Sequence, residues 1–117
     1  MSITTERMDL MARLLDVAAM RHDVIAQNVA NVNTPGYTTL EVSFEDALKE
    51  SLAGNSKASN AKAEMVEGTG GVPREDGNNV DIDMEMARLQ KNALYFKVYT
   101  QIMANDLAQY RSAITGR

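Results

Sequence analysis

The C-terminal third of the sequence carries an apolar pattern that indicates one long helix. Ten positions between Ile82 and Ile114 alternate steps of four and three residues without a break. A heptad seam of this length is typical of coiled-coil packing. At about 1.5 Å per residue, the helix would be roughly 50 Å long. The seam consists of Ile82, Met86, Leu89, Ala93, Phe96, Thr100, Met103, Leu107, Tyr110 and Ile114.

A second amphipathic helix is predicted near the N-terminus, from about Thr5 to about Asn31. Its apolar positions follow the same spacing, as expected of one buried helical face. We therefore expect a mainly α fold in which the two terminal helices pair as an antiparallel, coiled-coil-like hairpin. Because such a hairpin buries little apolar surface, neighbouring copies or partners would complete it. The N-terminal stripe consists of Met8, Met11, Leu15, Ala18, His22, Ile25, Val29 and Val32.

The segment between the two helices has a different composition. It is rich in Ala, Ser, Asn and Lys, and then in Gly, Pro and Asp, with few large apolar residues. We expect residues 52–80 to be flexible, with a turn or strand pair near Met65–Val66 and Val72–Pro73. The predicted organisation is an N-terminal helix in 1–33, a turn, short helix and flexible middle in 34–80, and a C-terminal helix in 81–117.

Composition and charge argue against several functional classes. The formal net charge is −4, and no Lys/Arg cluster with interleaved aromatics suggests nucleic-acid binding. The absence of cysteine excludes disulfides and Cys-ligated zinc. No apolar run reaches the roughly 18 residues that a membrane span needs. Charged residues near the N-terminus argue against a cleaved Sec signal, so the protein either stays in the cytoplasm or leaves by another route.

No residue pattern supports catalysis, a cofactor or a metal site. His22 is the single histidine, which excludes a His-rich metal site, and we expect it at the boundary of the core. Asp81, Asp83 and Glu85 diverge around the helix axis, so their charges favour the start of a helix over a cation site. No phosphate-binding glycine motif is present. We therefore expect neither enzymatic activity nor catalytic residues.

The N-terminal helix is expected to stop at Thr34-Pro35-Gly36-Tyr37. Proline lacks an amide donor and disfavours helical backbone in the residue before it. Pro and Gly at the second and third positions suit a type II turn, whose third residue needs a positive φ.

Two stretches of the sequence resemble one protein family. "QNVANVNTPGY", residues 27–37, is similar to the N-terminal signature of bacterial flagellar axial proteins, the rod, hook and hook-associated family. In that family a long helix ends in Asn-x-x-Thr-Pro-Gly-Tyr. "DGNNVDIDMEMARLQKNALYF", residues 76–96, resembles the segment entering the C-terminal helix of the proximal rod proteins, the FlgB type. The motif residues here are Asn31, Thr34, Pro35, Gly36 and Tyr37, and residues 51–75 carry none of the resemblance.

The resemblance implies a structural subunit without enzymatic activity. Proteins of this family polymerise helically into the rod, the drive shaft between the membrane ring and the distal rod, hook and filament. Their terminal helices pair as a coiled coil, so the two seams would be assembly surfaces. The implied partners are other rod proteins, the rod adaptor, the membrane-ring protein, further copies of the chain and, transiently, the type III export apparatus. The implied location is the rod in the periplasmic space.

The segment from Phe44 to Leu48 has two interpretations. An apolar pair four residues apart can pack a short helix onto the main helices. Alternatively, Phe-x-x-x-apolar resembles the short motif by which early flagellar subunits dock at the export gate. The two interpretations are compatible, because docking at the gate would precede folding.

Two alternatives to a proximal rod subunit stay open at this point. A small helical-hairpin adaptor could bind a partner helix through the exposed Met and Leu faces. Another rod protein of the same family is the nearer competitor. The Thr-Pro-Gly-Tyr turn together with seams at both ends favours an axial protein, and the Asp-Gly-Asn-Asn-Val-Asp segment favours the proximal type.

Overall fold

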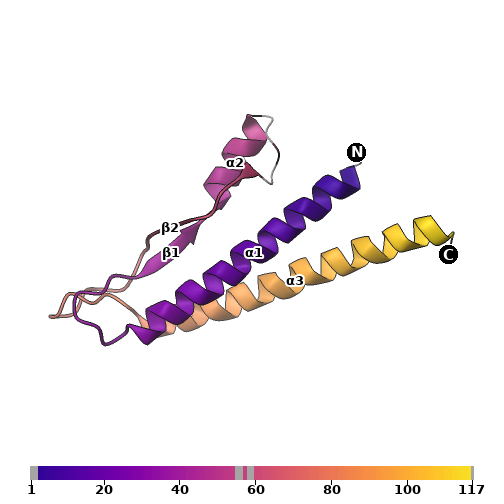
Figure 1. The fold of residues 1–117 in the computed structure, drawn as a ribbon. Coiled ribbons are helices and arrows are strands. Elements are labelled where there is room, and N and C mark those ends of the chain that lie inside the picture. The colour runs from indigo at the N-terminus through magenta and orange to yellow at the C-terminus, as the bar shows by residue number, and fades with distance from the viewer. Residues whose placement is uncertain (1–2, 55–56, 58–59, 117) are drawn as a thin grey trace.

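Two long helices lie side by side and run in opposite directions (Figure 1). The computed structural model describes residues 3–54, 57 and 60–116. Helix α1 spans Ile3–Ala30 and α3 spans Ile82–Thr115, and the two helices pack against each other. The prediction of a mainly α fold with paired terminal helices is thus confirmed. Residues 1–2, 55–56, 58–59 and 117, which belong to the predicted segments, lie outside the described residues.

Helix α3 has a defined cap at each end. The side chain of Asp81 accepts hydrogen bonds from the backbone nitrogens of Asp83 and Met84, at 2.9 and 3.3 Å. An acceptor at this position satisfies amide groups that have no partner within the helix. At the other end Gly116 is left-handed, with φ 73, and its amide donates to the carbonyl of Ser112. These caps and the absence of Gly and Pro between them permit a helix of 34 residues.

The middle of the chain forms an arm beside α1. Strand β1 (Leu40–Ser43) leads into helix α2 (Glu45–Ala53), and strand β2 (Glu64–Glu67) returns antiparallel to β1. The expected strand near Met65–Val66 therefore exists, but its partner is β1 and not Val72–Pro73. The main-chain pairing connects Leu40 with Glu67 and Ser43 with Glu64. Pro73 has no amide hydrogen to donate to a strand ladder.

The principal apolar cluster joins α1 to this arm. It consists of Val17, Val24, Val42, Phe44 and Ala61, and the Phe44 side chain is completely buried. By contrast, the buried side chains of α3 are all polar: Glu85, Asn92 and Asp106. The contact between α1 and α3 therefore has polar groups at its centre, and most of the apolar burial lies on the other side of α1.

The buried face of α1 is wider than the predicted stripe. Ala18 and Ile25 are buried as the spacing suggests, but so are Val17, Val24 and Asn28. The reason is that α1 packs against both α3 and β1, so it needs a wider face than one partner would require. His22 lies outside this face and is exposed, which corrects the expectation that it borders the core.

The molecule is long and thin. Its extents are 64 × 31 × 14 Å and its radius of gyration is 17.9 Å, whereas a compact chain of this length would have about 13 Å. Figure 1 shows α1 and α3 separating toward the end that holds both chain termini. Large apolar side chains remain exposed there, including Leu107 at 50% and Ile114 at 70%. A single chain thus leaves apolar surface uncovered.

Candidate functional site

The family-like turn closes directly after α1. The amide of Tyr37 donates to the carbonyl of Thr34 at 3.2 Å, and Gly36, the third residue of the turn, has φ 74. This is the positive φ that a type II turn requires at that position. The Thr34 hydroxyl donates to the Asn31 side-chain oxygen at 3.0 Å, while the Asn31 amide group donates to the carbonyl of Gln27 at 2.8 Å. The turn and the last turn of α1 are therefore held together locally.

The second family-like segment folds onto this turn. Asn78 is fully buried, and its Nδ2 donates to the carbonyl oxygens of Asn31 and Thr34, at 2.9 and 2.8 Å. Its Oδ1 accepts from the amide of Val80 at 2.8 Å. The amide of Gly36 also donates to the Asp76 carbonyl at 2.8 Å. One asparagine side chain thus gives a second hydrogen bond to two carbonyl groups at the end of α1, each of which also accepts a backbone amide, from Thr34 or from Tyr37.

Arg74 also connects the end of α1 to the segment that precedes α3. Its guanidinium donates to the carbonyl of Val80 at 3.1 Å and to the carbonyl of Val32, just beyond α1. Gly77, with φ 86, lies against Gly36, where a Cβ atom would be 3.5 Å from the Gly36 Cα. The two glycine turns therefore approach each other closely, and both adopt a conformation that suits glycine.

Asn28 is the centre of a polar network next to the turn. It is 1% exposed, and its Nδ2 donates to the Leu40 carbonyl at 2.9 Å and to Glu85 Oε2 at 3.0 Å. Its Oδ1 accepts from the Tyr37 hydroxyl at 2.8 Å and from the Leu40 amide at 3.1 Å. A single side chain on α1 thereby connects the turn, the start of β1 and the start of α3. We call Asn28 and its partners Tyr37, Leu40 and Glu85, together with Asn78 and Arg74, the polar junction.

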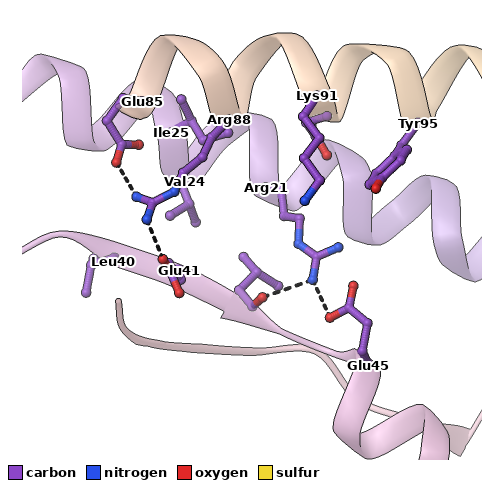
Figure 2. A pocket seen from close by; sticks show the side chains of 12 residues that line it. Arg21, Val24, Ile25, Leu40, Glu41, Glu45, Glu85, Arg88, Lys91 and Tyr95 are labelled. Carbon is purple, nitrogen blue, oxygen red and sulfur yellow. Dashed lines mark hydrogen bonds and ion pairs between the residues drawn. The ribbon is translucent and has the colours of Figure 1, made fainter. Parts of the chain in front are cut away.

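The network continues from Glu85 into a chain of ion pairs (Figure 2). Arg88 Nη1 lies 2.6 Å from Glu85 Oε1, and Arg88 Nη2 lies 2.8 Å from Glu41 Oε1 on β1. The buried Glu85 carboxylate is thus paired and hydrogen-bonded, as a charge in such a place must be. Burial, and secondly the charge of Glu85, raise the pKa of Tyr37 above its ordinary value. The Tyr37 hydroxyl is therefore kept protonated as a donor to Asn28.

A cleft of about 390 Å³ lies between α1, β1 and α3. Figure 2 shows its charged side chains pointing toward one another. Arg21 contacts Glu45 at 2.6 Å and donates to the Val42 carbonyl, and the hydrogen bond from Arg21 is the main cause that lowers the pKa of Glu45. The Lys91 ammonium lies 5.6 Å from the centre of the Tyr95 ring. The cleft thus consists largely of groups that already stabilise one another.

The predicted seam of α3 lies mostly on the outside of the molecule. Leu89 and Met103 are half-buried, whereas Ile82, Met86, Phe96, Leu107, Tyr110 and Ile114 are exposed. The reason is geometric: Met86 and Leu107 each follow a buried polar residue by one position, about 100° around the helix. On α1, Ile25 is buried, and Met8, Met11, Leu15 and Val29 are half-buried.

Phe44 and Leu48 lie at the start of α2, directly after β1. Phe44 has no exposed surface and belongs to the apolar cluster, while Leu48 is half-buried and packs against that cluster. The amide of Leu48 donates to the Phe44 carbonyl at 2.9 Å, in the first turn of α2. In the folded chain this pair is thus a core element, and Phe44 is inaccessible from outside.

Two features are absent from the described residues. Within residues 3–54, 57 and 60–116, no group of His, Cys, Asp and Glu side chains has the arrangement of a metal site. In the same part of the chain, no helix is long and apolar enough to cross a bilayer.

Sequence reasoning found the turn but missed its partners. Asn28, Arg74 and Asn78 were not singled out, although Asn28 and Asn78 lie inside the two family-like stretches. The sequence does contain a signal for both asparagines: Asn28 interrupts an apolar helix face, and Asn78 lies within a tight turn. Both are positions where such a group commonly satisfies backbone atoms.

Comparison with known proteins places the same segments in one family. A family model described as "Flagella basal body rod protein" matches residues 15–38, the second half of α1 and the turn. The flagellar basal body rod protein FlgB of Borrelia hermsii is 33% identical, over 90% of this chain and 93% of its own length. FlgB of Borreliella burgdorferi is 31% identical over 83% of the chain and 87% of its own length, and FlgB of Bacillus subtilis is 24% identical over 99% and 98%. The chain therefore belongs to the FlgB family of flagellar basal body rod proteins.

Proposed function

We propose that this chain is a structural subunit of the proximal rod, which polymerises helically and transmits torque from the membrane ring to the distal rod and hook. The observation that carries the proposal is the exposed apolar seam of α3 in a chain whose relatives are rod proteins over nearly their full length. The proposal assigns residues 1–33 and 81–117 to the helical rod part and residues 34–80 to the middle.

The energetics of the seam support assembly. Fully burying a large apolar side chain contributes about 1.5–3 kcal/mol, so covering one that is half exposed contributes about 1 kcal/mol. Six seam residues of α3 are exposed in this way: Ile82, Met86, Phe96, Leu107, Tyr110 and Ile114. Neighbouring subunits that covered them would gain several kcal/mol for each copy added. Other rod proteins, the rod adaptor and the membrane-ring protein are the proposed neighbours, in the periplasmic part of the basal body.

The proposal is tested by deleting the gene in its host and imaging cell envelopes by electron microscopy. We expect membrane rings without rods, hooks or filaments, and restoration of all three by the intact gene. Complete flagella in the deletion strain would contradict the proposal, and a hairpin adaptor would then become the better account.

We further propose that Phe44 and Leu48 are read by the type III export apparatus before the chain folds. The complete burial of Phe44 means that a receptor can reach it only in an unfolded chain. Phe44→Ala should reduce secretion of the subunit, measured as the fraction recovered outside the cytoplasm. Val24→Ala is the matched control, because Val24 lies in the same apolar cluster but outside the motif. Equal secretion of the two variants would mean that Phe44 is a core residue and is not read by the export apparatus.

A further inference from the structure

Three buried polar side chains lie on the face of α3 that meets α1. Glu85 is 1% exposed, Asn92 is 7% exposed and Asp106 is 8% exposed. They are seven and fourteen residues apart, so they occupy one heptad position and point to the same side. An apolar helix pair would place Leu or Ile at such positions. Their polarity therefore requires a physical reason.

Each of the three meets one group of α1. Glu85 accepts a hydrogen bond from Asn28 at 3.0 Å, and Asn92 Nδ2 donates to the Ala18 carbonyl at 2.8 Å. Asp106 Oδ2 lies 3.0 Å from Arg7 Nε as an ion pair, although within the described part of the chain this oxygen has no donor in hydrogen-bond geometry.

The outer two contacts define a single register. Asp106 lies 21 residues after Glu85 in α3, and its partner Arg7 lies 21 residues before Asn28 in α1. Both contacts therefore fit one antiparallel alignment of straight helices.

We propose that Glu85, Asn92 and Asp106 select the register in which α3 pairs with α1. A shift by one heptad displaces the helices by about 10 Å. In one direction the shift brings Asp106 opposite Leu14, and in the other it carries Asp106 past the start of α1, so Asp106 loses Arg7 in both cases. Either shift leaves a buried polar group without its partner, which is strongly unfavourable.

The apolar residues cannot select this register by themselves. The seam of α3 repeats after seven residues, so a slide by one heptad would bring Phe96, which is exposed in the observed register, to the place of the half-buried Leu89 or Met103. A slipped pair would bury similar apolar surface. Specific polar contacts at one heptad position are a known means of fixing the alignment of paired helices. The inference concerns the hairpin alone and holds whether or not the chain enters a rod.

Cysteine cross-linking tests the proposal on the full chain, which has no cysteine of its own. Met11→Cys is combined with Ile102→Cys, which lies opposite it in the observed register, or with Tyr95→Cys or Gln109→Cys, which would lie opposite after a shift. A short bismaleimide is applied at low protein concentration, and the monomeric cross-linked product is measured. We expect the first pair to react predominantly in the otherwise unchanged chain.

The pairs are then placed in a Glu85→Leu/Asn92→Leu/Asp106→Leu background. We expect helicity by circular dichroism to persist and the two shifted pairs to react comparably with the first. The matched control adds three leucines at exposed positions of α3, as Gln90→Leu/Lys97→Leu/Asn105→Leu, and should retain the original preference. A triple-leucine variant that still reacts only through the first pair would overturn the proposal.

A charge exchange provides a second test if the triple-leucine variant loses its helicity. Asp106→Arg places a cation against Arg7 and should weaken the preference for the first cysteine pair. Combining it with Arg7→Asp should restore that preference. An unchanged preference in the single variant, or none restored in the double variant, would show that these charges do not select the register.

Discussion

Replacing Asn28 with alanine would remove four hydrogen bonds that join α1 to the turn, to β1 and to α3. The lost bonds are those to Leu40 N and O, to the Tyr37 hydroxyl and to Glu85 Oε2. The side chain is 1% exposed, so water has little access to the groups that would lose their partners. The substitution therefore tests the polar junction at its centre.

The expected loss of folding stability comes from the buried polar groups that lose their hydrogen-bond partner. A buried polar group without a partner costs about 1–3 kcal/mol. Tyr37 is half-buried and can regain a bond to water, and Glu85 keeps its ion pair with Arg88. The remaining penalty falls on Leu40 and on one oxygen of Glu85, which gives about 3 kcal/mol in total. A small domain has only about 5–15 kcal/mol of stability, so the melting temperature should fall by roughly 10 °C.

Urea unfolding followed by circular dichroism measures the change. Gln27→Ala is the matched control, because Gln27 is the preceding residue of α1 and its side chain is exposed. We expect a change below about 0.5 kcal/mol for the control. A loss below about 1 kcal/mol for Asn28→Ala would refute the view that the junction holds the helices together, since one ordinary hydrogen bond contributes that much.

Four further substitutions test the turn and its contacts. Gly36→Ala should cost about 1 kcal/mol by urea unfolding, because φ is 74 and the added Cβ meets no atom within 4 Å, so only the backbone conformation opposes it. In the Pro35→Ala/Gly36→Ala double variant, α1 should continue past its present end into the turn. Slower amide hydrogen exchange of the turn residues would show this extension. Asn78→Ala should destabilise by about 2 kcal/mol, since two buried side-chain hydrogen bonds to carbonyl groups are lost at about 1 kcal/mol each, and an unchanged urea midpoint would contradict its role at the end of α1. The pKa of Tyr37 is raised in the folded chain, so its contribution is present below about pH 10 and is lost as the pH rises through the folded value. Tyr37→Phe should therefore flatten the loss of stability above about pH 10, and an unchanged slope would contradict this assignment.

The long helices could be predicted because their signals are local. A heptad run without Gly or Pro indicates α3 wherever it occurs, and Pro35-Gly36 marks the end of α1 through its backbone restrictions. These features need no knowledge of distant partners. The same is true of the caps, since Asp81 acts on the residues that immediately follow it.

The pairing of β1 with β2 could not be predicted in the same way. The two strands are separated by α2 and a long loop, and β2 is exposed on every residue, so it lacks the alternation that marks a half-buried strand. Phe44 was recognised as one of an apolar pair, but its place at the centre of the cluster depends on Val17 and Val24 of a distant helix.

The polar junction lies furthest from what periodicity can reveal. Asn78 acts on carbonyl groups 44 and 47 residues away, and Asn28 acts on a carboxylate 57 residues away. Apolar spacing indicates which face of a helix is buried, but it does not indicate that a buried face is polar. For that reason the seam of α3 was recognised, while the polar line beside it at Glu85, Asn92 and Asp106 emerged only from the fold.

The most direct test of the proposed assembly is incorporation of a Leu107→Asp subunit into basal bodies. Leu107 is 50% exposed in the single chain, so the charge should be tolerated in the isolated protein. Gln109→Asp is the matched control, because it places the same charge at an exposed position on another side of α3. Each variant is expressed in the deletion strain, and its amount in purified basal bodies is measured by quantitative immunoblotting. We expect Gln109→Asp to be incorporated as the unchanged chain is, and Leu107→Asp to be absent although it is expressed and helical. Equal incorporation of both variants would contradict the claim that the exposed seam of α3 is an assembly surface.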